Sequence, residues 1–353
     1  MKKLIFTCIF LIFGLSLQAQ FLSGNVVVDS IYSTLLGNSG GEHPTRKISV
    51  YLPPGYYETN ERYPVIYFLH GFTLDNQTMF AWADLETKLN VAINTKKIRP
   101  VILVVSDQNT TYRGSFYTNS SLTGKWADFT ATDVVKYVDQ NFRTLSQRES
   151  RGVAGHSMGG HGAIKMGMLY PEVFSSVYAH SPAVLGLAKE LGPKGIGYRR
   201  APMITSHEEL VDGFKEFHPN VVVALGRAFS PNPEKPPFYA DLPYEYQDDE
   251  LIVNEEVLEL WMANCPIEML DEYASNLEKL KAFKLDWGRN EEHLHIPFTC
   301  RIFSEKMEIM GIDHFAEEYL GTHSNRINSE EGRILHQMLP FFNRFLSFEE
   351  EVK

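Results

Sequence analysis

Short, continuous apolar runs alternate along the chain with stretches in which apolar residues return every three or four positions. The runs "YPVIYFLHGF" (63–72) and "RPVILVVSD" (99–107) are rich in β-branched residues and show no regular polar alternation. Such runs are typical of strands that are buried on both faces of a parallel sheet. Between them "ADLETKLNVAINTKK" has helical periodicity, and so does the segment 126–142 with its stripe of valines and aromatic residues.

The same alternation continues to the end of the chain. We predict further strands at 25–34, 45–52, 150–155, 175–183, 281–288 and 314–321, and further helices at 160–174, 298–311 and 332–346. Strands that alternate with helices predict an α/β fold in one domain, with a predominantly parallel sheet flanked by helices.

The segment 186–276 breaks this rhythm. It contains the proline-dense stretch "SPNPEKPPFYADLP" and the acidic stretch "EYQDDE". Its aromatic residues, among them Phe238, Tyr244 and Trp261, give it enough apolar surface to fold rather than to remain a disordered linker. We therefore predict an insertion that packs over the ends of the strands, where ligands bind in such sheets.

The first residues differ from the rest of the chain. "MKK" followed by "LIFTCIFLIFGLSL" and a small residue, Ala19, predicts a signal peptide over 1–19, with the mature domain at 20–353. An uncleaved membrane anchor is the alternative. Export predicts a secreted or periplasmic protein, and it leaves Cys265 and Cys300 as the only cysteines. These two could form one bridge, but we expect two separately buried thiols.

Charge narrows the choice of partner. Without the leader, 31 basic residues face 44 acidic ones, which gives a formal charge of −13. Such a surface repels nucleic acid and anionic membranes, so we expect a small or neutral partner. The chain beyond the leader has no apolar run of about 20 residues, the length a membrane-spanning helix needs. The oligomeric state stays open.

The stretch "GHSMG" (155–159) matches Gly-x-Ser-x-Gly between a predicted strand and a predicted helix. This context is what a nucleophile elbow requires, in which Ser157 has strained backbone angles and an exposed hydroxyl. Gly155 and Gly159 would remove the collisions that such a sharp turn creates. The following glycines would let the helix pack closely on the sheet. A glycine-rich turn without chemistry is the plainer interpretation.

Two backbone N–H groups are expected to stabilise a negative oxygen beside Ser157. Met158 provides one of them at the start of the helix. The other lies in "FLHGF" (68–72) after a buried strand, where we favour the N–H of Phe72 over that of Gly71. We expect His70, in the same stretch, to shape the loop rather than to take part in catalysis.

A nucleophilic serine needs a base that follows it in the chain, in the order serine, acid, histidine. His323 in "GTHSNR" lies on a loop between the last predicted strand and the last predicted helix. Other histidines fit less well, because His161 and His336 fall within predicted helices and His314 begins a strand. We therefore assign His323 as the base.

Three carboxylates compete for the role of the acid. Glu291 lies three residues beyond Gly288, on the loop that follows the preceding strand, and Glu292 is its neighbour. Asp286 falls inside that strand, where a buried hydrogen-bonded carboxylate is more natural. We favour Glu291, whose task would be to hold the tautomer of the histidine. The nearby "EEHLH" could suggest a metal site, but a histidine pair at a helix start fits it better.

These motifs together resemble a branch of the α/β-hydrolases that includes esterase D-like, feruloyl and acetylxylan esterases and the mycolyltransferases. The resemblance rests on "YLPPGY", "YPVIYFLHG", "GHSMGGHGAIKMGMLYPEVFSSVYAHSP", "DWGRNE" and "GTHSNR", and it spans most of residues 45–345. It implies the α/β-hydrolase fold, a serine nucleophile at Ser157 and a base at His323. It also implies an acid at position 291, where relatives usually carry aspartate.

The resemblance has further implications for the site. Relatives often line their pocket with aromatic residues at the positions of Trp126, Tyr112, Phe116 and Tyr117, and of these we select Trp126 and Tyr117. Ordinary packing would explain the same aromatic residues. The resemblance implies neither a metal nor an organic cofactor.

The sequence thus predicts an exported serine carboxylesterase that acts through an acyl-enzyme on Ser157. Its substrates would be acetyl- or feruloyl-type esters of carbohydrates or small alcohols. An acyltransferase would use the same acyl-enzyme, and a carbohydrate- or lipid-binding protein on an inactive hydrolase fold is a third interpretation. The identity of the ester depends on the segment 186–276, where the resemblance is weakest.

Overall fold

The computed structural model describes residues 21–349, and the predicted signal peptide lies outside them. Within the described residues, no helix has the length and apolar character needed to cross a membrane. Eight strands form one central sheet. In spatial order they are β1 (Asn25–Tyr32), β2 (Thr45–Leu52), β4 (Ile102–Ser106), β3 (Val65–Leu69), β7 (Arg151–His156), β8 (Ser176–His180), β11 (Ala282–Gly288) and β12 (Phe315–Tyr319).

The sheet is predominantly parallel, as the apolar runs predict. Only β1 with β2 and β2 with β4 pair antiparallel, and all later neighbours pair parallel. Every residue of β3, β4 and β8 is buried. Along β3, Val65 and Tyr67 pack into the apolar core on one face, while Ile66 and Phe68 pack into the core on the other. A strand with helices on both faces buries both alternating sets of side chains, so its residues are predominantly apolar.

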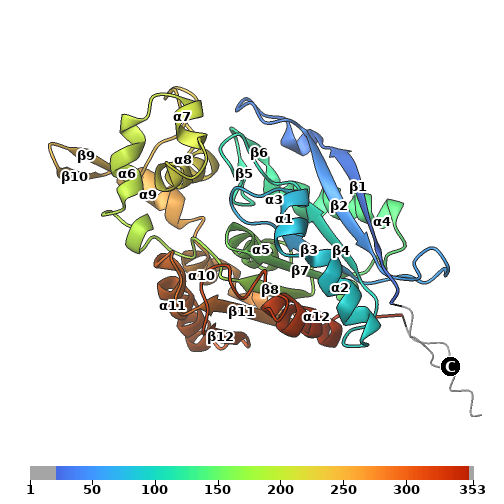
Figure 1. Ribbon diagram of the computed structural model, residues 1–353. Helices are drawn as coiled ribbons and strands as arrows, with labels where there is room; N and C mark the ends of the chain where they lie inside the picture. The colour runs from blue at the N-terminus through green and yellow to red at the C-terminus, as the bar shows by residue number, and fades with distance from the viewer. Residues whose placement is uncertain (1–20, 350–353) are drawn as a thin grey trace, which may run out of the picture.

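Helices cover both faces of the sheet (Figure 1). One core contains residues from α1 (Asn76–Trp82), α2 (Leu85–Asn94) and α12 (Leu339–Phe345), which a π-helical turn at Ile334–Met338 precedes. The other core contains residues from α3 (Trp126–Asp128), the π-helical Phe129–Val134, α4 (Val135–Asn141), α5 (Met158–Leu169), α10 (Pro266–Leu277) and α11 (His295–Ile309). Cys265 and Cys300 are buried in this second core and are not bonded to each other.

The predicted insertion forms a folded unit at one end of the sheet, seen in yellow-green in Figure 1. Its elements are α6 (Ile196–Arg200), α7 (His207–Val211), α8 (Phe217–Phe229), the hairpin of β9 (Tyr244–Gln247) and β10 (Glu250–Val253), and α9 (Glu255–Met262). Trp261 is fully buried within it and donates its Nε1–H to Ser230 Oγ at 2.7 Å. The last part of the predicted insertion is α10, which packs against α5 beside the sheet.

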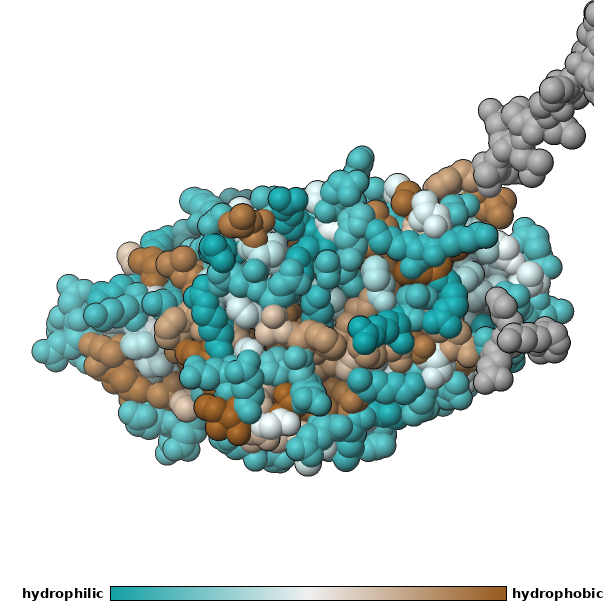
Figure 2. All heavy atoms as spheres, turned by 90° about the horizontal axis from the view of Figure 1, so that it is seen from below, coloured by the Kyte–Doolittle hydropathy of each residue, from teal (hydrophilic) through white to brown (hydrophobic). Residues whose placement is uncertain are grey.

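Smaller elements connect these layers. The two-residue strands β5 (Asn119–Ser120) and β6 (Gly124–Lys125) form a hairpin, and β5 contacts both α8 and α3. Figure 2 shows that hydrophilic side chains cover much of the face seen from below, with smaller groups of apolar residues toward the left, where the insertion lies in Figure 1, and elsewhere on this face.

Candidate active site

Ser157 occupies a strained turn between β7 and α5. Its backbone angles are φ 59° and ψ −116°, a region that residues with side chains rarely adopt. The neighbouring strand compensates this strain, because the Ser157 N–H donates to His180 O at 3.0 Å. The Ser157 carbonyl in turn accepts from the Ala183 N–H at 3.1 Å. A strained turn of this kind, between a strand and a helix, is typical of a nucleophile elbow.

Two glycines make this turn sterically feasible. A Cβ on Gly155 would lie 2.1 Å from the Gly159 carbonyl oxygen, and a Cβ on Gly159 would lie 1.9 Å from that of Leu69. Backbone atoms cannot yield at such distances, so both positions require glycine. The following glycines, Gly160 and Gly162, were expected to let the helix pack on the sheet. A Cβ on Gly160 would lie 2.9 Å from the His180 carbonyl oxygen of β8, as expected, whereas a Cβ on Gly162 would meet the Tyr117 ring at 2.5 Å instead.

The two N–H groups predicted to stabilise an oxyanion lie beside Ser157. Phe72 follows β3, Met158 begins α5, and both residues line the same pocket as Ser157. Among the described residues, the backbone N–H of Phe72 donates to no backbone acceptor outside helices and strands, and Met158 is the first residue of α5, where N–H groups have no partner within the helix. The loop holding Phe72 is close to the serine, since a Cβ on Gly71 would lie 3.6 Å from Ser157 Cβ. Both residues thus lie where the proposed oxyanion donors are expected.

His70 is a structural residue of that loop. Its Nδ1–H donates to Gly71 O at 2.9 Å, and its Nε2 accepts from the Gln108 N–H at 2.8 Å. The ring is fully buried, and burial lowers its pKa. The imidazole thus stays neutral with both nitrogens occupied, as expected for a residue that shapes the loop.

His323 lies on the loop after β12 and contacts Glu291. The distance from His323 Nδ1 to Glu291 Oε2 is 2.7 Å. The other carboxylate oxygen, Oε1, accepts from Ser181 Oγ at 2.5 Å and from the Gly288 N–H at 3.3 Å. Glu291 is buried, with 5% of its surface exposed. Of the three candidate carboxylates, Glu291 is the one bonded to the imidazole.

The two other carboxylates serve different contacts. Glu292 Oε2 accepts the backbone N–H of His323 at 3.0 Å. Asp286 is fully buried and bonds to Tyr178 Oη at 2.5 Å, His180 Nδ1 at 2.9 Å and Arg333 Nε at 2.6 Å. Burial opposes its charge, but His180 and Arg333 outweigh burial and hold the Asp286 pKa at about 2.

Two further histidines surround His323, and the sequence pattern did not indicate them as its neighbours. His156 donates its Nε2–H to the His323 carbonyl oxygen at 2.8 Å, and their ring centroids are 4.6 Å apart. The His293 ring meets the His323 ring edge-on at 4.8 Å. Burial, with a smaller contribution from His295, lowers the His323 pKa to about 4. The imidazole is therefore neutral at neutral pH, the form that accepts a proton.

A pocket opens at Ser157 between the sheet and the insertion. The space free of atoms there amounts to about 510 Å³, part of which is open solvent. The insertion contributes Leu191, Phe217 and Val221 to its walls, and the rest of the chain contributes apolar residues such as Phe116 and Ile296. The insertion thus packs over the strand ends, as its composition and position predict.

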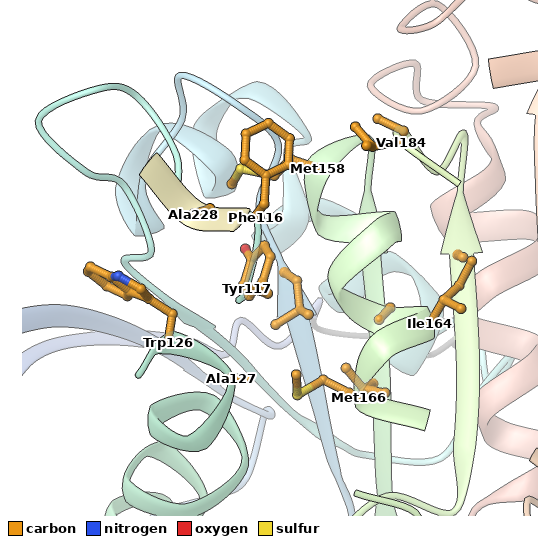
Figure 3. Packing of buried hydrophobic residues seen from close by; sticks show 14 of the residues in the cluster. Phe116, Tyr117, Trp126, Ala127, Met158, Ile164, Met166, Val184 and Ala228 are labelled. Atoms are coloured by element: carbon orange, nitrogen blue, oxygen red, sulfur yellow. The ribbon is translucent and has the colours of Figure 1, made fainter. Parts of the chain in front are cut away.

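Trp126 and Tyr117, expected on the pocket wall, do not line it. Both side chains are fully buried: Trp126 donates to Thr123 Oγ1 at 3.3 Å, and Tyr117 Oη donates to His70 O at 3.0 Å. In Figure 3 the Trp126 ring lies apart from Met158, beyond Tyr117. Phe116 takes the place on the wall. The physical reason is that both rings pack in the apolar core: Trp126 is the first residue of α3, and the Tyr117 ring lies against Gly162 of α5.

The "EEHLH" stretch forms the entry to a helix. His295 is the first residue of α11, and its ring centroid lies 6.4 Å from that of His293. In the described part of the chain, no three histidine, cysteine or acidic side chains gather as metal ligands.

Comparisons with known proteins agree with this architecture. The model of the family described as "Putative esterase" matches residues 42–326. An esterase of Mycobacterium tuberculosis (strain H37Rv) is 33% identical over 144 residues, which is 39% of this chain and 29% of the esterase. An S-formylglutathione hydrolase of Paracoccus denitrificans is 28% identical over 146 residues, 38% of this chain and 50% of that protein. The chain thus spans half or less of the length of these curated relatives.

Solved structures extend the likeness across the fold. A ferulic acid esterase superposes with a TM-score of 0.62 at 18% identity, covering 92% of this chain and 100% of that one. An S-formylglutathione hydrolase from Agrobacterium tumefaciens gives 0.59 at 18% identity, covering 92% and 97%. These neighbours have the α/β-hydrolase fold, which confirms the predicted fold class.

Proposed function

Because the chain belongs to the family described as "Putative esterase", we propose that it is a serine carboxylesterase acting through an acyl-enzyme on Ser157. One observation carries the proposal: Oε2 of the buried Glu291 lies 2.7 Å from Nδ1 of His323. The loop that bears His323 also contacts His156, the residue before Ser157. The order serine, acid, histidine along the chain is the order of α/β-hydrolase triads.

In the proposed reaction, Ser157 Oγ attacks the ester carbonyl while His323 Nε2 takes its proton. Glu291 keeps the other proton on Nδ1 and stabilises the imidazolium that forms. The N–H groups of Phe72 and Met158 hold the oxyanion of the tetrahedral intermediate. His323 then gives its proton to the leaving alcohol, and water releases the acyl group by the same steps in reverse order.

The surroundings of the acid support this role. The bonds from Ser181 and Gly288 occupy Glu291 Oε1 and leave Oε2 to His323. A carboxylate fixed in this way favours one tautomer and one orientation of the imidazole. Positioned hydrogen-bonded acids of this kind account for much of the rate of serine hydrolases.

The walls of the pocket support an ester with an apolar acyl group. We propose acetyl- or feruloyl-type esters of carbohydrates or small alcohols, and the likeness to a ferulic acid esterase agrees with this class. The proposed export rests on residues 1–19 alone. Exported esterases meet such esters outside the cell.

The test is hydrolysis of 4-nitrophenyl acetate and butyrate by the mature chain, beside Ser157→Ala. We expect turnover that the substitution lowers by at least about 10³-fold. Equal turnover by both proteins would overturn the proposal. The same assay with an added acceptor alcohol distinguishes an esterase from an acyltransferase. If the acyl group passes mainly to a dilute acceptor rather than to water, acyl transfer is the function.

A further inference from the structure

A second carboxylate–imidazole pair lines the pocket of Ser157. Glu190 lies in the 3₁₀ turn Lys189–Leu191, near the start of the insertion, and His295 begins α11. The distance from His295 Nδ1 to Glu190 Oε1 is 2.8 Å. The backbone N–H of His295 also faces both carboxylate oxygens, at 3.3 and 3.2 Å. Glu190 therefore orients the ring and caps the helix.

The other ring nitrogen of His295 has no partner. A carboxylate only accepts hydrogen bonds, so Nδ1 carries the proton that faces Glu190, and Nε2 is the remaining polar atom. Nε2 is fully buried and makes no hydrogen bond to any residue between 21 and 349. The whole side chain is only 6% exposed. An unpaired buried polar atom is costly, and because His295 lines the pocket of Ser157, a ligand bound there is the partner we consider for Nε2.

The apolar surroundings of Glu190 and His295 suit a pair of polar groups that selects a ligand. Most of the pocket wall is apolar, with Phe116, Val184 and Ile296 among its residues. A pocket that combines apolar walls with a few fixed polar groups uses the polar groups to select its ligand. The proposed reaction leaves this pair unused, because His323 already supplies the base.

The pocket is placed to hold the acyl part of an ester. Its lining includes Ser157 and both proposed oxyanion donors, Phe72 and Met158, but not His323. The leaving alcohol must lie near His323, which protonates it, so the acyl group extends away from that histidine and into the pocket.

We propose that Glu190 and His295 recognise a hydroxyl group on the acyl chain of the substrate. This inference rests on the proposed esterase function and adds a specificity-determining pair to it. A hydroxyl suits Nε2 in either form of the ring, since it donates to the neutral imidazole and accepts from the protonated one. An acyl group without the hydroxyl would leave Nε2 buried and unpaired, which selects against it.

The experiment compares methyl esters that differ in one hydroxyl: methyl 3-phenylpropanoate and its 3-hydroxyphenyl and 4-hydroxyphenyl counterparts. For the wild-type protein we expect kcat/KM for at least one hydroxylated ester to exceed that of the plain ester by about tenfold or more. In His295→Phe, which keeps a ring of similar shape, this ratio should fall close to one. Glu190→Gln should lower it less, because the amide oxygen still accepts from Nδ1–H.

The matched control is His43→Phe, a substitution of an exposed imidazole that does not line the pocket. It should keep the wild-type ratio. A wild-type ratio near one for both hydroxylated esters, or an unchanged ratio in His295→Phe, would overturn the inference while leaving the esterase function standing. Should none of the esters be hydrolysed, calorimetric binding of the product acids to Ser157→Ala decides: tighter binding of a hydroxylated acid supports the pair, and equal binding overturns it.

Discussion

The Nδ1 atom of His323 lies 2.7 Å from Oε2 of Glu291, three residues past the glycine that ends β11. The second oxygen of Glu291 bonds to Ser181 and to the backbone of Gly288. The carboxylate is thus held on both sides, and its burial strengthens the contact with the imidazole. The proposed reaction depends on this relationship more than on any other contact to His323.

Glu291→Gln should lower kcat by about 10² to 10⁴-fold, because an amide nitrogen facing Nδ1 favours the wrong tautomer of His323. Glu292→Gln is the control. Its side chain accepts only the backbone N–H of His323, and the glutamine oxygen can still accept it, so we expect less than about a tenfold loss. Steady-state kinetics with 4-nitrophenyl butyrate measure both. A larger loss in the Glu292 variant would show that Glu292, and not Glu291, is the acid.

Activity should persist at mildly acidic pH. The base acts only when its imidazole is neutral, and burial lowers the pKa of His323 to about 4. The protonated, inactive form therefore accumulates only as the pH falls toward that value, and kcat/KM should stay level from about pH 8 to 6. Circular dichroism at each pH shows whether a loss of activity at low pH comes from protonation of His323 or from acid unfolding. A half-loss at or above pH 6.5 in folded protein would contradict a lowered pKa.

Asp286→Asn should act on stability rather than on the chemical step. Removing the charge leaves Arg333 and His180 without their buried partner, which costs about 3 to 5 kcal/mol of unfolding free energy. Glu317→Gln is the matched control, because Glu317 pairs with the same arginine but is partly exposed, and it should cost at most about 1 kcal/mol. Urea denaturation measures both. If Asp286→Asn instead abolished hydrolysis at unchanged stability, Asp286 would be the acid.

Gly155→Ala should prevent the elbow from forming. The new methyl group would lie 2.1 Å from the carbonyl oxygen of Gly159, so we expect a loss of more than about 4 kcal/mol or no soluble protein. Gly37→Ala is the control, since Gly37 is exposed with φ −61° and its nearest contact is 3.2 Å. That change should stay within about 0.5 kcal/mol, measured by thermal unfolding. Wild-type stability in Gly155→Ala would contradict the described turn.

The sequence predicts the sheet and the turn at Ser157 well, because both follow from local patterns. Fully apolar runs specify strands with helices on both faces, and glycines around one serine specify a sharp turn. The position of Glu291 could also be anticipated, since it depends on its distance from the glycine that ends a strand. Asp286 could be set aside for the same reason, as a side chain inside the strand.

Other features depend on contacts between distant segments, which no local pattern reveals. Ser181, which follows β8, donates a hydrogen bond to Glu291, which follows the adjacent strand β11. His156 donates a hydrogen bond to the carbonyl oxygen of His323. Phe116 lines the pocket, whereas Trp126 and Tyr117, which were expected there, are buried in the core. The pairing of His295 with Glu190 requires the segment after β8 to fold back onto α11.

The proposed function turns on whether Ser157 is a nucleophile, and covalent labelling tests this most directly. The mature chain would be treated with a fluorophosphonate probe, and the adduct counted by intact mass and located by peptide mapping, beside Ser157→Ala. We predict one adduct per chain, on Ser157, and none in the variant. Equal labelling of the variant, or an adduct on another residue, would contradict the account.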